Sequence, residues 1–143
     1  MLYTLKSAGK KYAYDSVSGA VIQLNALQFK MLGAILPPLT AVCPTSLRYE
    51  LAKFDSMDVE EAYEGIYALS RDGIIYKEDD GKIRIATQGE NACTDASLAG
   101  ELIALAFADA PDEFAFEVAG NLLTEEIKTI AAGEAVKLGK KII

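Results

Sequence analysis

Three short stretches in which polar and apolar residues alternate precede any helical pattern, and they constrain the fold of this chain most strongly. They cover Leu2–Lys6, Lys11–Asp15 and Ala20–Leu24. Alternation with a period of two is typical of strands that bury one face. The pattern becomes helical only at Asn25. A ribbon of this kind leaves a strand edge open, and an open edge is a place where another peptide can bind.

The composition indicates a folded, acidic protein. The chain has 143 residues, of which 51% are hydrophobic, so it can build one domain or two very small ones around a packed core. The formal net charge is −7. The part through Ala86 holds 10 basic and 11 acidic residues (−1), and the part from Thr87 holds 4 and 10 (−6). Because such a chain repels phosphate backbones, nucleic acid is not an expected partner.

Cysteine and histidine usage limits the chemistry and the compartment. The two cysteines, Cys43 and Cys93, show no disulfide framework, which fits a reducing cytoplasm. Histidine is absent, which removes the commonest general base and the commonest metal ligand. The sequence pattern predicts neither a signal peptide nor a membrane-spanning run. We therefore expect a cytoplasmic protein with no membrane partner, no metal, no cofactor and no catalytic residue.

Three helices are predicted after the ribbon. Asn25 is a good N-cap for a helix that runs to Leu36, before Pro37-Pro38. A short helix follows Pro44, and a third helix runs from Asp58, as its N-cap, to Asp72. The run Ile74–Tyr76 and the run Lys82–Ile85 then predict a hairpin around an acidic tip. Strands, helices and hairpin together predict a winged helix-turn-helix over residues 1–81.

A winged helix raises the alternative of a DNA-binding regulator, which would read DNA with the first half of its third helix. That half carries four carboxylates, and the tip of the predicted wing carries three more. They are Asp58, Glu60, Glu61, Glu64, Glu78, Asp79 and Asp80. Their charge opposes binding to a phosphate backbone, so this alternative is disfavoured.

Residues 82–143 follow a different pattern, that of a small α/β unit. Strand, helix, strand, helix and strand alternate, with a helix over Ala96–Ala108, a strand over Glu113–Val118 and a helix from Thr124, as N-cap, to Gly139. Crossover helices indicate a parallel sheet. The fold class is therefore α+β, with a second part that resembles an incomplete barrel. Two or three parallel strands cannot bury both faces, so this part must pack on the first part or on a partner, and we expect a homo-oligomer.

The first part resembles the precursor-peptide recognition domains of peptide-modifying enzymes, whose simplest member is the pyrroloquinoline-quinone biosynthesis chaperone D. The residues that carry the resemblance are Lys11–Asn25 and Ala68–Ile75. The resemblance implies that a leader peptide adds as a strand along the third strand and packs against the third helix. The implied peptide-binding residues are Ala20, Val21, Ile22, Gln23, Leu24, Tyr63, Ile66, Tyr67 and Arg71. Val21 and Ile66 also fit plain core positions, and Tyr67 and Arg71 also fit ordinary surface positions.

The second part is similar to the first βα units of radical S-adenosylmethionine peptide maturases. Ile83–Thr87 stands where that family has its first barrel strand, and Phe114–Leu123 stands where it has the second. That family holds a [4Fe–4S] cluster with three cysteines, whereas this segment offers Cys93 alone. Ala119-Gly120-Asn121 replaces the Gly-Gly-Glu-Pro motif of the family. The resemblance thus implies a degenerate, truncated relative without cluster chemistry.

Three functions remain open from the sequence. The leading prediction is a non-catalytic accessory protein that binds a leader peptide by strand addition, as in ribosomal-peptide maturation. The second is an interaction or regulatory subunit that docks on a full-length maturase or on a second copy. The third is an enzyme that uses Cys93 or the carboxylates of Asp112, Glu113 and Glu117, and it is disfavoured because no histidine base accompanies them.

Overall fold

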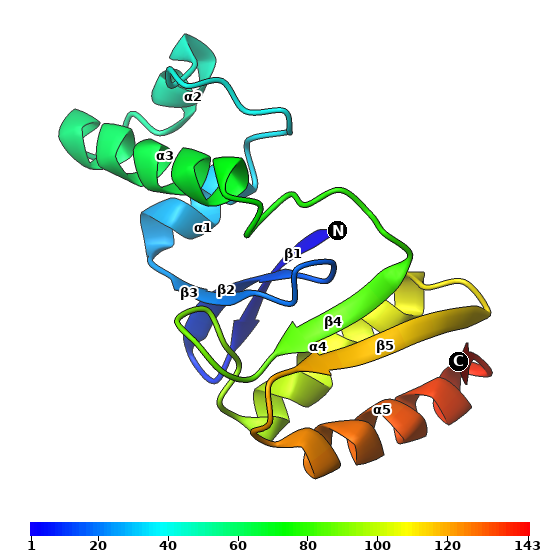
Figure 1. Cartoon of the computed structure of the whole chain (residues 1–143). Coiled ribbons are helices and arrows are strands. Elements are labelled where there is room, and N and C mark those ends of the chain that lie inside the picture. The colour runs from blue at the N-terminus through cyan, green and yellow to red at the C-terminus, as the bar shows by residue number, and fades with distance from the viewer.

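The computed structural model describes all 143 residues and has an α+β fold. Five helices accompany two three-stranded sheets, one antiparallel and one parallel (Figure 1). Neither sheet closes into a barrel. The predicted fold class is therefore confirmed. None of the helices combines the length and the apolar character needed to cross a membrane.

The antiparallel sheet is formed by the three strands predicted at the start of the chain. They are β1 (Leu2–Ser7), β2 (Lys10–Asp15) and β3 (Val21–Leu24), with β2 in the middle. Ala8 and Gly9 join β1 to β2 with φ of 50° and 78°, the left-handed conformations of a two-residue hairpin turn. Because β2 is central, β1 and β3 are both edge strands.

The first two helices are α1 (Ala26–Leu32) and α2 (Thr45–Glu50). Asn25 caps α1 as predicted, since its side chain accepts from the Gln28 amide while the Gln28 side chain accepts from the Asn25 amide. The expected extension of α1 to Leu36 is wrong. Gly33 closes the helix after Leu32, before the two prolines are reached.

The third helix, α3 (Ser56–Arg71), begins earlier than predicted. Asp55 is its N-cap, and the Asp55 carboxylate accepts from the Met57 amide at 2.9 Å. The predicted N-cap, Asp58, lies instead inside the first turn, where its charge still complements the helix dipole. Both aspartates satisfy the cap preference, so the sequence pattern alone did not distinguish them.

The predicted wing hairpin is wrong. Ile74–Tyr76 forms bends and pairs with no strand, and Ile75 is buried in the core beneath the helices. Gly73 and Tyr76 both have positive φ, of 73° and 54°, which turns the chain instead of extending it. The strand β4 (Lys82–Ala86), expected to close that hairpin, pairs in parallel with a later strand.

The parallel sheet follows the predicted alternation of strands and helices. After β4 come α4 (Ala96–Asp109), β5 (Glu113–Ala119), α5 (Thr124–Leu138) and β6 (Lys141–Ile142), and the strand order is β4-β5-β6. Gly139 ends α5 with φ of 68°, as predicted. Thr124 is not the N-cap, because Leu123, with φ of 55°, holds that position and Thr124 is the first helical residue.

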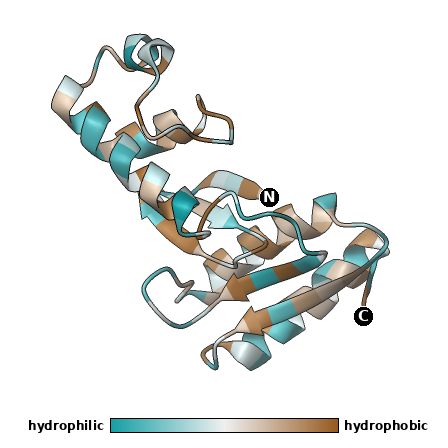
Figure 2. Ribbon diagram, turned by 45° about the horizontal axis from the view of Figure 1, so that its top comes forward, coloured by the Kyte–Doolittle hydropathy of each residue, from teal (hydrophilic) through white to brown (hydrophobic).

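Two hydrophobic clusters lie on the two sides of the antiparallel sheet. Ala13 and Leu24 belong to the cluster with α1, α2 and α3, whereas Tyr14 and Val21 belong to the cluster with the parallel sheet, α4 and α5. Figure 1 shows the sheet between the helical part and the parallel part. Figure 2 shows hydrophilic and hydrophobic bands alternating along β4 and β5, as expected of strands with one buried face.

The turn between β2 and β3 attaches directly to the outer edge of β4. We call Ser16–Gly19 the joining turn. The Arg84 amide donates to the Ser16 carbonyl at 2.7 Å, and the Ala86 amide donates to the Gly19 carbonyl at 2.8 Å. The Arg84 guanidinium adds a bond to the Val17 carbonyl at 2.7 Å. Main-chain bonds thus cross between residues 1–81 and 82–143, the two predicted domains.

Candidate peptide-binding edge of the antiparallel sheet

The outer edge of β3 offers main-chain groups that nothing in the chain uses. In an antiparallel pair, neighbouring residues point their N–H and C=O groups alternately toward and away from the partner strand. The Val21 amide points away from β2, since it donates to the Asn91 carbonyl at 3.2 Å. The same alternation directs both main-chain groups of Gln23 outward, and the Gln23 side chain is exposed. A strand edge is therefore open at Gln23 and partly covered at Val21.

The side chains of the predicted strand segment divide between the two faces of the sheet. Val21, 6% exposed, packs with Tyr14 on the side of the parallel part. Leu24 and the half-buried Ile22 face the helical part. Ala20, the residue directly after the joining turn, is also buried. Of the five residues predicted on this segment, Gln23 alone is exposed, so the edge can be recognised chiefly through its main chain.

The predicted residues of α3 fall into two groups. Tyr63 and Ile66 are 1% and 2% exposed and belong to the helical core. The Tyr63 hydroxyl donates to the Thr40 carbonyl at 2.6 Å, which fixes the loop after α1. These two side chains are structural. Tyr67 is half-buried and Arg71 is exposed, so both remain accessible to a partner.

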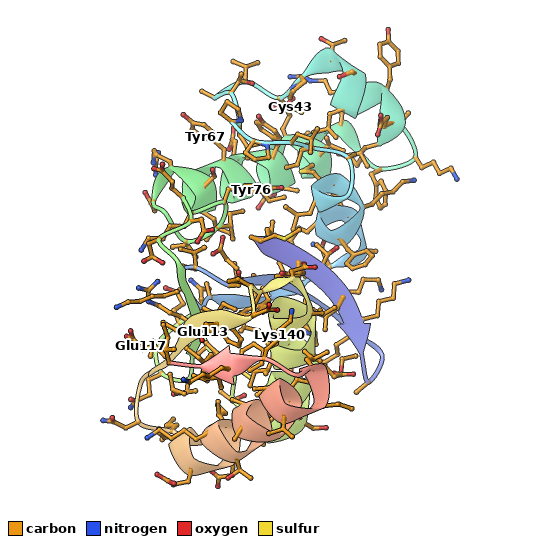
Figure 3. The ribbon with its side chains drawn as sticks, turned by 90° about the vertical axis from the view of Figure 1, so that its right-hand side faces the viewer. Cys43, Tyr67, Tyr76, Glu113, Glu117 and Lys140 are labelled. Carbon is orange, nitrogen blue, oxygen red and sulfur yellow. The ribbon has the colours of Figure 1, made fainter.

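Tyr67 and Arg71 line a groove that is separate from β3. The groove has a volume of about 690 Å³. Its lining residues are Pro37, Pro38, Leu39, Tyr67, Ser70, Arg71, Tyr76 and Glu78. Figure 3 shows Tyr67 and Tyr76 beside α3. No residue of β3 contributes to this groove, so the structure does not join the two halves of the predicted site into one surface.

Of the carboxylates considered for catalysis, Glu117 alone forms an ion pair, on the open face of the parallel sheet. Glu117 lies 3.8 Å from the Arg84 guanidinium, which also pairs with Asp80 at 2.8 Å. A hydrogen bond from Arg84 lowers the pKa of the Asp80 carboxyl. Glu113 is exposed on the same strand, and the side chains of Glu113 and Glu117 are visible along β5 in Figure 3. Arg84 and its two carboxylate partners thus form a small ion-pair network on the surface of the sheet.

The two thiols are buried and separate. Cys93 is 1% exposed, and its thiol donates to the Asp95 carbonyl at 3.2 Å. Burial raises the pKa of the Cys93 thiol and that of the Cys43 thiol. Both shifts disfavour the thiolate, which is the form that binds metals and attacks substrates. No group of three or more cysteine, aspartate or glutamate side chains is placed to hold a metal ion.

Sequence reasoning missed the second open edge of the sheet, that of β1. This edge lies beside α4, whose exposed stripe includes Glu101, Leu105 and Asp109. The sequence held part of the evidence for this edge, because Tyr3 and Leu5 alternate with polar residues along β1. The nearness of β1 to α4 cannot be predicted from a local pattern, because their contacting residues lie 94 and 106 positions apart along the chain.

No known protein-family model matches the chain, and no curated protein is significantly similar to it.

Proposed function

We propose that this chain is a non-catalytic accessory protein that binds an extended leader peptide as an added strand beside β3. The observation that carries the proposal is the outward main chain of Gln23 on an edge strand. A peptide strand that pairs there gains main-chain hydrogen bonds without needing side-chain matches. The resemblance of Lys11–Asn25 to precursor-peptide recognition domains supports the same edge.

The contact between Val21 and Asn91 also supports the proposal. The chain already places one of its own main-chain carbonyls beside β3, at 3.2 Å from the Val21 amide. This edge can therefore accept an extended backbone at hydrogen-bonding distance. A bound peptide would run along β3 from Val21 past Gln23. It would either stop at the segment near Asn91 or displace that segment from Val21.

Two further features belong to this proposal. The compartment is the cytoplasm, in keeping with two unpaired thiols. Nucleic acid is not the partner, because four carboxylates lie within residues 56–64 of α3 and the net charge is −7. One of those carboxylates, Glu60, forms an ion pair with Arg48 of α2.

Docking on a full-length maturase is the second candidate function. The groove lined by Tyr67 and Arg71 favours it, because this groove offers a surface for such a partner.

The experiment titrates the labelled protein with leader segments of short precursor peptides encoded near it, and follows the amide resonances. We expect shifts at Val21–Leu24. The Gln23→Pro variant removes an outward N–H at an edge strand, where proline is tolerated, and it should abolish these shifts. Thr4→Pro on β1 is the matched control and should leave them intact. Unmoved resonances at β3 with every leader segment would refute the proposal.

A further inference from the structure

A groove runs between β1 and α4, on the opposite edge of the antiparallel sheet. Its volume is about 500 Å³. It is lined by Tyr3, Leu5, Glu101, Ala104, Leu105, Ala108 and Asp109. The floor is apolar, and Leu105 is 37% exposed although it is a large hydrophobic residue on a helix. Figure 3 shows β1 beside α4.

The main chain of β1 is open along the whole groove. The Ser16 amide donates to the Met1 carbonyl at 3.0 Å, which sets the alternation of hydrogen bonds between β1 and β2. The bonded pairs along the strands are then Tyr3 with Tyr14 and Leu5 with Tyr12. The main-chain groups of the intervening residues point outward. These residues are Leu2, Thr4 and Lys6, so β1 offers a longer free edge than β3 does.

A carboxylate stands at each end of the groove. The Tyr3 hydroxyl donates to Asp109 at 2.8 Å, and the Ser7 hydroxyl donates to Glu101. Neither carboxylate forms an ion pair, and α4 carries no lysine or arginine. Both groups are exposed and accept a single neutral hydroxyl, so they remain free to pair with cations.

The spacing of these carboxylates matches a strand. The two contacts show that α4 runs antiparallel to β1. Glu101 and Asp109 are eight helical residues apart, which is about 12 Å along α4. Ser7 and Tyr3 are four strand residues apart, which is about 13 Å along β1. On an added strand, side chains opposite Ser7, Leu5 and Tyr3 therefore face Glu101, Leu105 and Asp109 in turn.

We infer that this edge binds an extended segment of another protein with the pattern basic-x-apolar-x-basic, paired with β1 and packed on α4. The apolar side chain covers Leu105, and the two basic side chains pair with Glu101 and Asp109. The charge complementarity favours such a segment over a second copy of this chain. Two β1 strands paired about Thr4 would bring Glu101 of one copy toward Asp109 of the other, without a cation between them.

The inference concerns a different edge from the proposed function, so the two can fail separately. The probe is a synthetic peptide, acetyl-Thr-Ser-Lys-Thr-Leu-Thr-Lys-Ser-Thr-amide, titrated into the labelled full chain at low salt. We expect amide shifts at Leu2, Thr4 and Lys6 and none at Gln23. The control peptide, with glutamate in place of both lysines, should bind at least about tenfold more weakly, and added salt should weaken the first peptide.

Variants of the protein separate the charges from the main chain. Glu101→Gln and Asp109→Asn should each weaken the lysine peptide about tenfold, whereas Glu125→Gln on α5 should not change it. Thr4→Pro should abolish binding and Gln23→Pro should not. Equal binding of both peptides, shifts at Gln23 alone, or full binding by the two α4 variants would overturn the inference. So would concentration-dependent dimerisation that protects the β1 amides without peptide.

Discussion

The hydroxyl of Tyr14 on β2 donates to the main-chain carbonyl of Arg84 on β4 at 2.5 Å. Tyr14 is fully buried, and its ring also packs against Tyr3 with centroids 6.1 Å apart. One side chain therefore joins the antiparallel sheet to the parallel one. Tyr14→Phe leaves the Arg84 carbonyl without this donor and should lower the free energy of unfolding by about 1–3 kcal/mol.

Urea denaturation measures this effect, and Tyr12→Phe is the matched control. Tyr12 lies on the same strand and face, and its hydroxyl makes no hydrogen bond within the chain. Its change should stay within about 0.5 kcal/mol. Equal losses from both variants would mean that the bond between Tyr14 and Arg84 does not contribute.

The joining turn depends on glycine at position 19. Gly19 has φ of 83°, and a Cβ there would lie 3.0 Å from the Ala86 nitrogen and 3.2 Å from the Arg84 carbonyl carbon. Gly19→Ala should therefore destabilise the fold by about 1–3 kcal/mol, from backbone strain and from separation of the turn from β4. Thermal unfolding followed by circular dichroism reports this change.

Gly133 provides a control of opposite sign. It lies on the exposed face of α5, and an added Cβ would meet nothing within 4 Å. Gly133→Ala should stabilise the fold by about 0.5–1 kcal/mol, because alanine loses less conformational entropy in a helix. If Gly19→Ala behaved like Gly133→Ala, the close approach of the turn to β4 would be refuted.

Lys140 closes the C-terminal end of α4. Its ammonium group donates to the carbonyls of Phe107, Ala108 and Ala110 at 2.8, 3.0 and 2.7 Å. The three carbonyls lie where a helix leaves acceptors unpaired. Lys140→Met should cost about 1–3 kcal/mol in unfolding free energy, whereas Lys128→Met, at an exposed position of α5, should stay within about 0.5 kcal/mol.

Hydrogen exchange offers an independent measure of the Lys140 effect. The amides in the last turn of α4 should exchange faster in Lys140→Met than in the parent protein, while those of α3 should not change. Unchanged protection in α4 would show that the three bonds do not hold the helix end.

Alkaline pH should unfold the protein through its buried tyrosines. Burial raises the pKa of Tyr3, Tyr14 and Tyr76 above the ordinary value of 10.0. A raised phenol pKa stabilises the fold fully below the unfolded pKa. This contribution is lost as pH rises above about 10, toward the folded pKa, because the unfolded chain loses its proton first.

Phenolate absorbance and circular dichroism, followed together, test this expectation. The phenols of Tyr3, Tyr14 and Tyr76 should ionise only as the far-ultraviolet signal is lost. Titration of all seven tyrosines below the unfolding transition would contradict the expected burial of Tyr14.

Features set by near neighbours were predictable from the sequence. The cap at Asn25 and the end of α5 at Gly139 depend on residues within a few positions, and the structure confirms both. The alternation along β1, β2 and β3 likewise follows from the period of two. These interactions need no knowledge of the rest of the fold.

Features set by distant contacts were not predictable. Ile74–Tyr76 has the composition of a strand, yet Ile75 fills the core under the helices instead of pairing. The side on which Val21 packs could not be predicted either, because β3 lies between two cores and has a buried residue on each face, Val21 on one and Leu24 on the other. A period of two shows that a strand has two different faces, but it does not show which core each face joins.

The joining turn blocks one edge of the parallel sheet, so that further strands can be added only at the other edge. Closure of a barrel requires a last strand to pair with the free edge of the first. At β4 that edge is already occupied by the carbonyls of Ser16 and Gly19. A further strand from any molecule can therefore pair with this sheet only beyond β6. On the other side, the antiparallel ribbon prevents strand addition to β4.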